Sequence, residues 1–559
     1  MRPRPALSLL LLALAAAAPA RAAGEESWNL MLVDGREAGY VHSVTEPTAD
    51  GGHVTTVDSL FRMKRLGSEV KVGTTITTHE DAAGRITRIR QVADMAASET
   101  VSVGEVRDGE LVVTTTVQGK DWKSSIEWPD DVPGPVELER RRRAAGDAPG
   151  TTLTFLQFDF TIGEPFELTT TVVGEETVEI AGEERRLLRV VTTSDLLPET
   201  VAWLDDEGGE VKTSTSLMGM EITTVPAGPD QVARFLDSGE SAEVFLQSTI
   251  RSNVRLPRPR DLTSVTYRLV PKQAGASRPD LEDERQSIVG RDGDATLLRV
   301  ELVVPPEDRR QRRPMEQAPA ELLEFLEPNA FLQSDDRRLI AMASRGVGDE
   351  TDAWRAAQKL EALVHDTIEE KSLDVAFATA LEVCVDRRGD CSEHAVLLAA
   401  LCRSAGIPSR VAMGLVYVGG IFGGHAWTEV SIDGEWYALD GTIGRGTADP
   451  THLRFGASSL ANGGLSTAMF GIVKGLGAFD LEIVEYAHGD AVVRVAIERA
   501  TASVVDGVFT DPNERLRFVV PDGWTARSGA TDLLEMSNLH TVARLRSDAS
   551  SGTIQVQAW

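Results

Sequence analysis

The sequence contains few cysteines. Only Cys384, Cys391 and Cys402 occur among 559 residues, which is too few for a scaffold held together by disulfide bonds. Because the number is odd, at least one thiol stays outside any disulfide within the chain. A bond between Cys384 and Cys402 remains open on count alone, whereas the apolar surroundings of Cys402 favour a small buried hydrophobe.

Positive charge is also in deficit. The chain has 57 Lys and Arg residues against 86 Asp and Glu residues, which gives a formal net charge of −29. Nucleic acids and anionic lipid surfaces are bound through cationic surfaces. We therefore expect no nucleic-acid partner, and no anionic membrane surface as the main partner.

Long apolar runs are absent after the first residues of the chain. Residues 1–23 combine a positive start at Arg2 and Arg4, the apolar run Ala6–Ala18 and a cleavage site at Ala20-Arg-Ala22, which is typical of a secretory signal peptide. The run is shorter than the ~20 residues that span a bilayer, although an uncleaved anchor is the alternative. The sequence thus predicts an exported protein, periplasmic or secreted, with no transmembrane segment after cleavage.

Metal-binding motifs are missing as well. The nine histidines are scattered along the chain and show no ligand spacing such as H-E-x-x-H. We therefore expect no metal and no other cofactor.

Residues 24–235 are predicted to form one or more antiparallel β-domains. Apolar and polar residues alternate in several stretches, and Asp-Gly pairs separate these stretches as turns. The charged run Arg140–Arg143 is expected to be a solvated face or a short helix end, and not a binding patch. The predicted strands are Trp28–Val33, Val70–Thr78, Leu111–Val117, Phe166–Val173 and Leu187–Thr193.

Residues 236–315 are predicted to hold a further β-rich segment and a linker. A helix is expected over Gln231–Ser248, and strands follow within Ser264–Val304. The linker is Pro305–Pro314, which is rich in proline and charge.

From residue 316 the apolar spacing becomes helical. We predict an α+β core over residues 316–455, an extension over 456–489 and a small C-terminal β-domain over 490–559. The helices expected in the core are one carrying Leu322, Leu323, Phe325 and Leu326, one carrying Trp354, Leu360, Leu363, Val364 and Ile368, and a short one over Phe377–Cys384.

Cys391 is predicted to open a buried helix. Asp390 suits the N-cap, and Glu393 completes a pattern that resembles a capping box, while Gly406 and Pro408 end the helix. The unpaired N–H groups and the helix dipole favour a thiolate in the first turn, although the neighbouring Asp390 opposes it. The alternative is that Cys391 is simply a small buried residue.

The stretch from His425 to Asp440 is predicted to form a β-hairpin. Asp433-Gly434 is a strong two-residue turn, and its register pairs Trp427 with Asp440. His425 then lies on the same face as Asp440, one diagonal step away, at a Cβ separation of ~7–8 Å. The hairpin alone would therefore place an imidazole beside a carboxylate, as a base and its orienting group.

These residues together resemble the core of the transglutaminase-like superfamily. The resemblance covers about residues 320–455. The matching stretches are Arg388-Gly-Asp-Cys-Ser-Glu-His-Ala395, Leu401–Val411 with Gly414, Gly424–Val430, Trp436 and Leu439–Thr442.

The resemblance implies a papain-like α+β core, in which a helix that carries a cysteine packs on an antiparallel sheet. It implies that Cys391 is the nucleophile, that His425 is the general acid and base, and that Asp440 orients the imidazole. Gly441 stands where this family often has proline, which leaves the triad intact.

An oxyanion formed at this site would need hydrogen-bond donors. The backbone N–H of Cys391 can serve as one of them. For the second donor the sequence offers only Trp354 and Gln358 as candidates.

The whole chain is thus predicted to be multidomain: N-terminal antiparallel β-domains, a central transglutaminase-like α+β core and a small C-terminal β-domain. Its expected function is that of an exported cysteine enzyme, which attacks an amide or ester carbonyl through an acyl-enzyme. Water as acceptor would make it a peptidase or amidase, and an amine would make it a transferase.

The expected partner is a protein or peptide substrate in the cell envelope, and the oligomeric state is left open. The chain lacks the paired Cys-x-x-Cys motifs of a peptide N-glycanase. One alternative is a non-catalytic envelope scaffold or adhesion protein with a degenerate core. Another is a small-molecule acyltransferase that uses the same triad.

Overall fold

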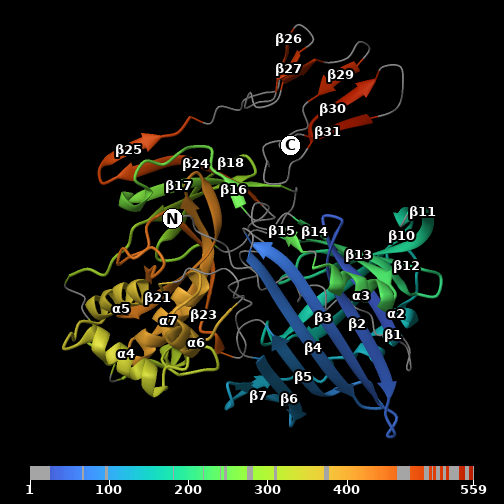
Figure 1. Ribbon diagram of the computed structural model, residues 1–559, viewed down its shortest axis with the longest axis horizontal. Helices are drawn as coiled ribbons and strands as arrows, with labels where there is room; N and C mark the ends of the chain where they lie inside the picture. The colour runs from blue at the N-terminus through green and yellow to red at the C-terminus, as the bar shows by residue number, and fades with distance from the viewer. Residues whose placement is uncertain are drawn as a thin grey trace.

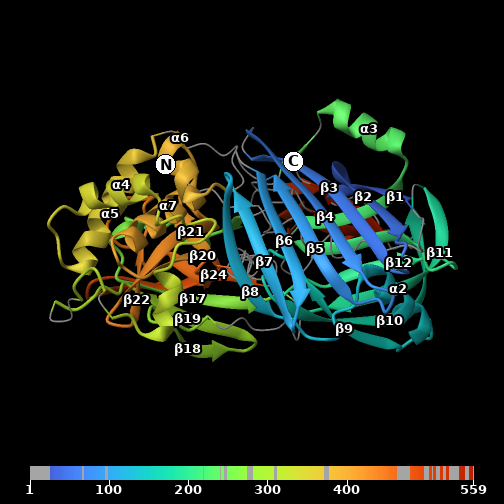
Figure 2. The same ribbon diagram turned by 90° about the horizontal axis from the view of Figure 1, so that it is seen from below.

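The computed structural model describes residues 26–496 apart from 66–67, 95–98, 181, 218–219, 240, 244–248, 273–280, 308–310, 316, 370–376 and 462–478, and short strands between 503 and 557. The predicted signal peptide, residues 1–23, lies outside the described residues. Across the described part of the chain, no helix is long and apolar enough to cross a membrane. A large β-rich part and a mixed α+β part lie side by side (Figures 1 and 2).

The N-terminal part is one 15-stranded sheet in which β8 to β1 run in order and are followed by β14 back to β9. All the strands predicted here are confirmed. The strands are β1 (Glu26–Val33), β2 (Arg36–Pro47), β3 (His53–Arg65), β4 (Ser68–Glu80), β5 (Ile86–Asp94), β6 (Glu99–Arg107), β7 (Glu110–Val117), β8 (Lys120–Glu127), β9 (Thr152–Phe158), β10 (Pro165–Ile180), β11 (Glu183–Thr193), β12 (Thr200–Leu204), β13 (Glu210–Leu217), β14 (Met220–Ala227) and β15 (Ala242–Glu243), which pairs with β3.

Two helices accompany this sheet. The first, α2 (Pro135–Ala145), carries the arginine run, whose side chains pair with Glu137 and Glu139. The second, α3 (Pro229–Ser238), is shorter than the predicted helix, which was wrong in its length. Gly239 adopts a left-handed conformation with φ 65° and ends the helix there.

The central part contains a helical layer that surrounds one buried helix. The helices are η2 (Ala320–Phe325), α4 (Arg337–Val347), α5 (Ala353–Thr367), α6 (Ala380–Asp386) and α7 (Cys391–Ser404). The first predicted helix is wrong: it is a short 3₁₀ turn in which Leu323 is 46% exposed. Helix α4 was not predicted. Helix α7 packs against α4, α5 and α6 on one side and against a sheet on the other.

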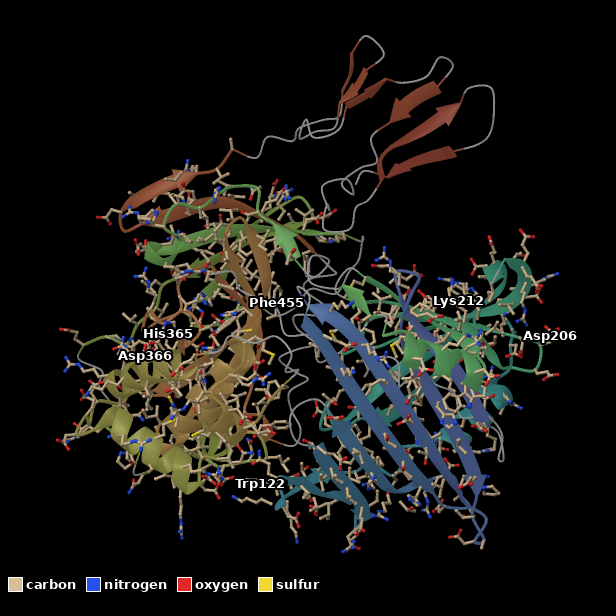
Figure 3. The ribbon with its side chains drawn as sticks, viewed as in Figure 1. Trp122, Asp206, Lys212, His365, Asp366 and Phe455 are labelled. Atoms are coloured by element: carbon tan, nitrogen blue, oxygen red, sulfur yellow. The ribbon has the colours of Figure 1, made fainter. Side chains whose placement is uncertain are left out.

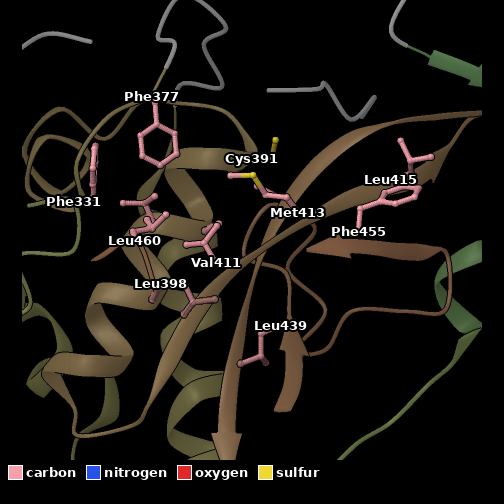
Figure 4. Packing of buried hydrophobic residues seen from close by; sticks show 14 of the residues in the cluster. Phe331, Phe377, Cys391, Leu398, Val411, Met413, Leu415, Leu439, Phe455 and Leu460 are labelled. Carbon is pink, nitrogen blue, oxygen red and sulfur yellow. The ribbon is translucent and has the colours of Figure 1, made fainter. Parts of the chain in front are cut away.

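That sheet is formed by β16 (Thr249–Arg251), β20 (Ser409–Val418), β21 (Ile421–Ile432), β22 (Glu435–Leu439) and β23 (His452–Ser458). It therefore includes a strand from before the predicted core segment 316–455. Figure 4 shows the packing between α7 and this sheet, where Cys391, Leu398 and Met413 are buried.

A second sheet of five strands joins segments from both sides of the core. Its order is β18-β19-β17-β24-β25, and the short helix η1 (Pro259–Asp261) precedes it. The predicted C-terminal β-structure is present as two small three-stranded sheets. The remaining strands are β17 (Ser264–Pro271), β18 (Gln286–Asp292), β19 (Ala295–Glu301), β24 (Phe479–His488), β25 (Ala491–Arg494), β26 (Ser503–Val505), β27 (Val508–Thr510), β28 (Arg517–Val519), β29 (Trp524–Arg527), β30 (Thr541–Ser547) and β31 (Thr553–Gln557).

Gly414 allows three strands of the central sheet to meet closely. It lies opposite His425 on β21 and opposite Arg454 on β23, beside an irregularity in the pairing. A Cβ atom at this position would lie 1.9 Å from the carbonyl oxygen of Leu453. Backbone atoms cannot yield that space without separating the strands.

We predict that Gly414→Ala lowers the free energy of unfolding by about 3 kcal/mol, the upper end of the usual cost of overpacking. Chemical denaturation followed by fluorescence measures the change. Gly290→Ala on β18 is the matched control, since its Cβ would lie 3.6 Å from Leu297, at ordinary contact distance. Equal stability of the two variants would contradict this account of the strand spacing.

Candidate active site

The first turn of α7 is built as predicted. The Asp390 carboxylate caps the helix by accepting the backbone N–H of Ser392 at 3.0 Å, and Glu393 accepts the N–H of Asp390 at 2.8 Å. Gly389 has φ 146°, and a Cβ there would lie 2.3 Å from the Cβ of Glu393. The glycine before the cap is therefore needed for the chain to turn tightly into the helix that Cys391 begins.

The carboxylates near Cys391 are largely neutralised or occupied. Burial and the neighbouring Asp390 raise the pKa of Glu393 to about 8, so this side chain is mainly protonated at neutral pH. Asp390 also accepts the hydroxyl of Ser392 at 2.8 Å. Of these two carboxylates, Asp390 is therefore the one that opposes a thiolate, as the sequence implies.

The predicted hairpin is confirmed in its register. Its turn contains Asp433 at φ 53°, and the ladder between β21 and β22 ends with the pair Thr428–Leu439. Asp440 lies one residue beyond the end of β22. The predicted pair of Trp427 with Asp440 is therefore not part of the ladder, because the chain leaves the sheet at Asp440.

His425 lies at a gap in the sheet. On one edge of β21, β16 pairs as far as Gly423 and β22 begins its pairing at Thr428. Among the described strands, none covers residues 424–427 on that edge. This edge of β21 is therefore unpaired at His425, as far as the described strands show.

His425 and Asp440 are in direct contact. Nε2 of His425 lies 2.8 Å from Oδ2 of Asp440, and both side chains are almost fully buried. An ionised carboxylate only accepts hydrogen bonds, so Nε2 carries the proton. In the neutral ring, Nδ1 is then the basic atom. It is buried and has no hydrogen-bond partner among the described residues.

Asp440 is held through both oxygens. Oδ1 accepts the backbone N–H groups of Thr442 at 2.8 Å and Ile443 at 3.3 Å. Oδ2 accepts His425 and also Nε2 of His452 at 3.0 Å. Burial alone would raise the pKa of Asp440, but the two imidazoles outweigh it and hold the pKa well below its ordinary value. Asp440 is therefore a fixed anion.

The first turn of α7 adjoins this corner at two points. The hydroxyl of Thr428 donates to the carbonyl of Ala395 at 2.9 Å. A Cβ on Gly441 would lie 3.8 Å from the Cβ of His394. Both helix residues are within about one turn of Cys391, so the start of α7 is tied to β21 and to the loop after Asp440.

The thiol itself is 2% exposed and belongs to the main apolar cluster of the protein. Within the described residues no hydrogen bond reaches Nδ1 of His425, that of the thiol included. The structure thus brings His425 and Asp440 into contact, and the approach of Cys391 to this pair stays a prediction.

His452, which sequence reasoning missed, is the second imidazole on Asp440. It lies at the start of β23 and follows Asp449, whose carboxylate accepts both the N–H and the hydroxyl of Thr451. Only this local turn pattern, Asp-Pro-Thr-His, marks it in the sequence. Its partner Asp440 belongs to another strand end, and nothing in the spacing predicts that contact.

The same cluster could be considered for a metal ion. One atom each of His425, Asp440 and His452 lies within 4.8 Å of the other two. However, these atoms already satisfy one another, since Oδ2 accepts both Nε2–H groups. Hydrogen bonding accounts for the arrangement, and the expectation of no metal stays a prediction.

The other cysteines and the candidate oxyanion donors have separate surroundings. None of the three cysteines, all of which are described, forms a disulfide, and Cys402 is fully buried as predicted. Trp354 packs on Tyr437 with ring centroids 5.9 Å apart, and the amide of Gln358 donates to Gly446. No described contact places either side chain at Cys391.

Helix α5 supports the loop after Asp440. His365, labelled in Figure 3, has Nδ1 3.0 Å from the carbonyl oxygen of Gly441. Glu361 accepts the N–H of Gly446 at 3.0 Å. This helix thus fixes the chain that follows the carboxylate.

Comparison with known sequences assigns the central segment. Residues 340–441, which contain Cys391, His425 and Asp440, match the core of the transglutaminase-like superfamily. No curated protein matches the chain.

Three solved structures that align with parts of the chain illustrate its similarities. A candidate cysteine protease from Cytophaga hutchinsonii is 18% identical over 36% of this chain and 80% of its own, with a TM-score of 0.27. The periplasmic domain of TgpA from Pseudomonas aeruginosa, bound to ethylmercury, is 17% identical over 35% and 89%, with a TM-score of 0.20. A β-barrel-like DUF1849 protein from Brucella abortus is 14% identical over 37% and 98%, with a TM-score of 0.29.

The raised pKa of Glu393 predicts a pH-dependent stability. The folded chain keeps this proton up to about pH 8, whereas the unfolded chain releases it near the ordinary value of 4.5. The stabilising contribution of Glu393 to the free energy of unfolding is therefore fully present below pH 4.5, and it is lost as the pH rises through 8. Between pH 4.5 and pH 8, the free energy of unfolding of the wild type should fall relative to that of Glu393→Gln by up to about 1.4 kcal/mol per pH unit.

Urea denaturation of both proteins at several pH values measures this difference. Glu382→Gln at the matched position of α6 reports the effect of replacing a capping carboxylate as such. If wild type and Glu393→Gln kept a constant stability difference from pH 5 to pH 8, Glu393 would not be protonated in the folded chain.

Proposed function

We propose that the transglutaminase-like domain at residues 340–441 makes this protein an exported cysteine enzyme that attacks an amide or ester carbonyl and forms an acyl-enzyme. Cys391 is the nucleophile, His425 the general acid and base, and Asp440 the group that orients the imidazole. Two supports are independent of each other: the family of the segment, and the contact between the base and its carboxylate.

One observation carries the proposal above all. The bond from Nε2 of His425 to Asp440 leaves Nδ1 as the basic atom, and this atom is buried without a partner among the described residues. A buried polar atom normally has a hydrogen-bond partner, and the exceptions often mark catalytic groups. Nδ1 is therefore the atom to which the thiol of Cys391 delivers its proton.

The reaction follows from these assignments. Sγ of Cys391 transfers its proton to Nδ1, and the thiolate attacks the carbonyl carbon to form a tetrahedral intermediate. The imidazolium of His425 then protonates the leaving nitrogen or oxygen, and an acyl-enzyme forms. Water or an amine, deprotonated by Nδ1, attacks the acyl carbon. The C–S bond then breaks, the acyl product leaves, and the imidazolium returns the proton to Sγ of Cys391.

The substrate we propose is a protein or peptide of the cell envelope. Cys391, His425 and Asp440 are each at most 2% exposed, so side chains over the thiol must move before a carbonyl can reach it. Such a covered site restricts hydrolysis by bulk water. The role of the signal peptide and the choice between water and an amine remain part of the proposal.

A non-catalytic scaffold is the rival function, and the burial of the site is the observation that favours it, since Cys391, His425 and Asp440 are each at most 2% exposed. The two readings differ in what they predict for the reactivity of the thiol.

We predict that iodoacetamide alkylates Cys391 at least ~10-fold faster than Cys402 under reducing conditions, because an activated thiolate is the reactive form. Burial raises the pKa of Cys402 well above its ordinary value, so that thiol should stay inert. Peptide mass spectrometry gives both rates. His425→Gln should slow the labelling of Cys391, while His79→Gln on β4 should leave it unchanged. Equal labelling of the two cysteines would support the scaffold.

The reaction type requires a second experiment. Wild type and Cys391→Ala are incubated with an envelope extract and a primary-amine probe, and the products are read by mass spectrometry. We expect either amine incorporation or new cleavage with the wild type and neither with the variant. Products of the same amount with both proteins would remove Cys391 from the reaction.

A further inference from the structure

His452 is a buried imidazole between two acceptors. Its Nε2 lies 3.0 Å from Oδ2 of Asp440, and its Nδ1 lies 3.0 Å from the backbone carbonyl oxygen of Asp449. The carboxylate of Asp449 is also near, at 3.6 Å from Nδ1. The side chain is 1% exposed, so water does not offer alternative partners.

This arrangement favours the doubly protonated ring. A neutral imidazole has one N–H and one lone pair, and the lone pair would then face an acceptor oxygen at hydrogen-bond distance. An imidazolium donates on both sides. Burial lowers the pKa of His452, but Asp449 and Asp440 outweigh it, so that the pKa lies above its ordinary value.

The surrounding charges balance such an imidazolium. Asp449 pairs with Arg260 of η1 at 2.7 Å, and Arg285 donates to the Asp449 carbonyl at 2.9 Å. The site thus holds the cations His452, Arg260 and Arg285 against the anions Asp440 and Asp449, and the carboxylates of Asp283 and Glu429 also act on Arg285.

Three other elements also place titratable groups near His452 and Asp440. Burial and the charge of Asp440 raise the pKa of Glu361 on α5, which favours its neutral form. The hydroxyl of Tyr267 on β17 donates to the carbonyl of Pro450. His425 on β21 has its ring centroid 5.6 Å from that of His452.

We propose that His452 is a positioning residue of the active site: as an imidazolium it holds Asp440 in place and partly neutralises its charge. His425 then binds its proton less tightly than it would if Asp440 had no second imidazole beside it. This inference rests on the proposed function. Its consequence is a base that takes the proton of Cys391 and also releases it readily to the leaving group.

The same chain of contacts reaches outside the matched segment. Arg260 also donates to the backbone carbonyl of Tyr417 on β20, at 2.6 Å. A segment from well before residue 340 is therefore tied through Asp449 and His452 to the orienting carboxylate.

The first test is the protonation state of the histidine rings in the full-length mature protein labelled with ¹⁵N-histidine. His452 is assigned by comparison with His452→Gln. At pH 7 we expect both ring nitrogens of His452 to be protonated. A neutral ring at His452 would overturn the inference, and it would do so whether or not Cys391 is reactive.

The second test is an NMR titration of His425 in the Cys391→Ala protein, which has no thiol and so does not depend on the proposed chemistry. Removing the neighbouring cation with His452→Gln should raise the pKa of His425 by about one to two units, since a like charge at this distance disfavours the protonated ring. His79→Gln serves as the control. An unchanged titration of His425 would leave His452 with a merely structural role and overturn the inference.

Discussion

The hydrogen bond between Nε2 of His425 and Oδ2 of Asp440 is the interaction on which the site depends. It fixes the ring, selects the tautomer and leaves Nδ1 as the unprotonated ring nitrogen. Everything nearby maintains it: a tight turn at Asp433 sets the register of the hairpin, backbone N–H groups fill Oδ1, and the missing Cβ of Gly414 lets the strands approach. Cys391, the proposed nucleophile, begins a helix whose first thirteen residues are all buried.

Much of this corner could be predicted because it is encoded locally. The cap at Asp390, the capping box with Glu393 and the left-handed Gly406 are short-range patterns, and the helix has the predicted ends. The hairpin follows from its two-residue turn alone, which brings His425 to Asp440. Local hydrogen bonding and strand alternation decide such elements before any tertiary contact forms.

The rest depends on contacts between distant segments. His452 and Arg260 reach the site through tertiary packing, and no periodicity marks either residue. Strand β16 pairs with β21 in the central sheet, although all of the helices α4 to α7 lie between these two strands in the sequence. The stretch around Leu323 was wrongly predicted as a regular helix, since its clustered leucines mimic a helical stripe while the chain forms only a 3₁₀ turn. Long-range pairing of this kind overrides local preference.

The central claim is that the imidazole of His425 activates the thiol of Cys391. Its most direct measurement is the ultraviolet absorbance of the thiolate as a function of pH, taken as the difference between wild type and Cys391→Ala, and repeated in the His425→Gln background. The account predicts a thiolate pKa well below the ordinary ~8.5, and a return to that value or higher without the imidazole. A wild-type pKa at or above ~8.5 that does not change in His425→Gln would contradict it.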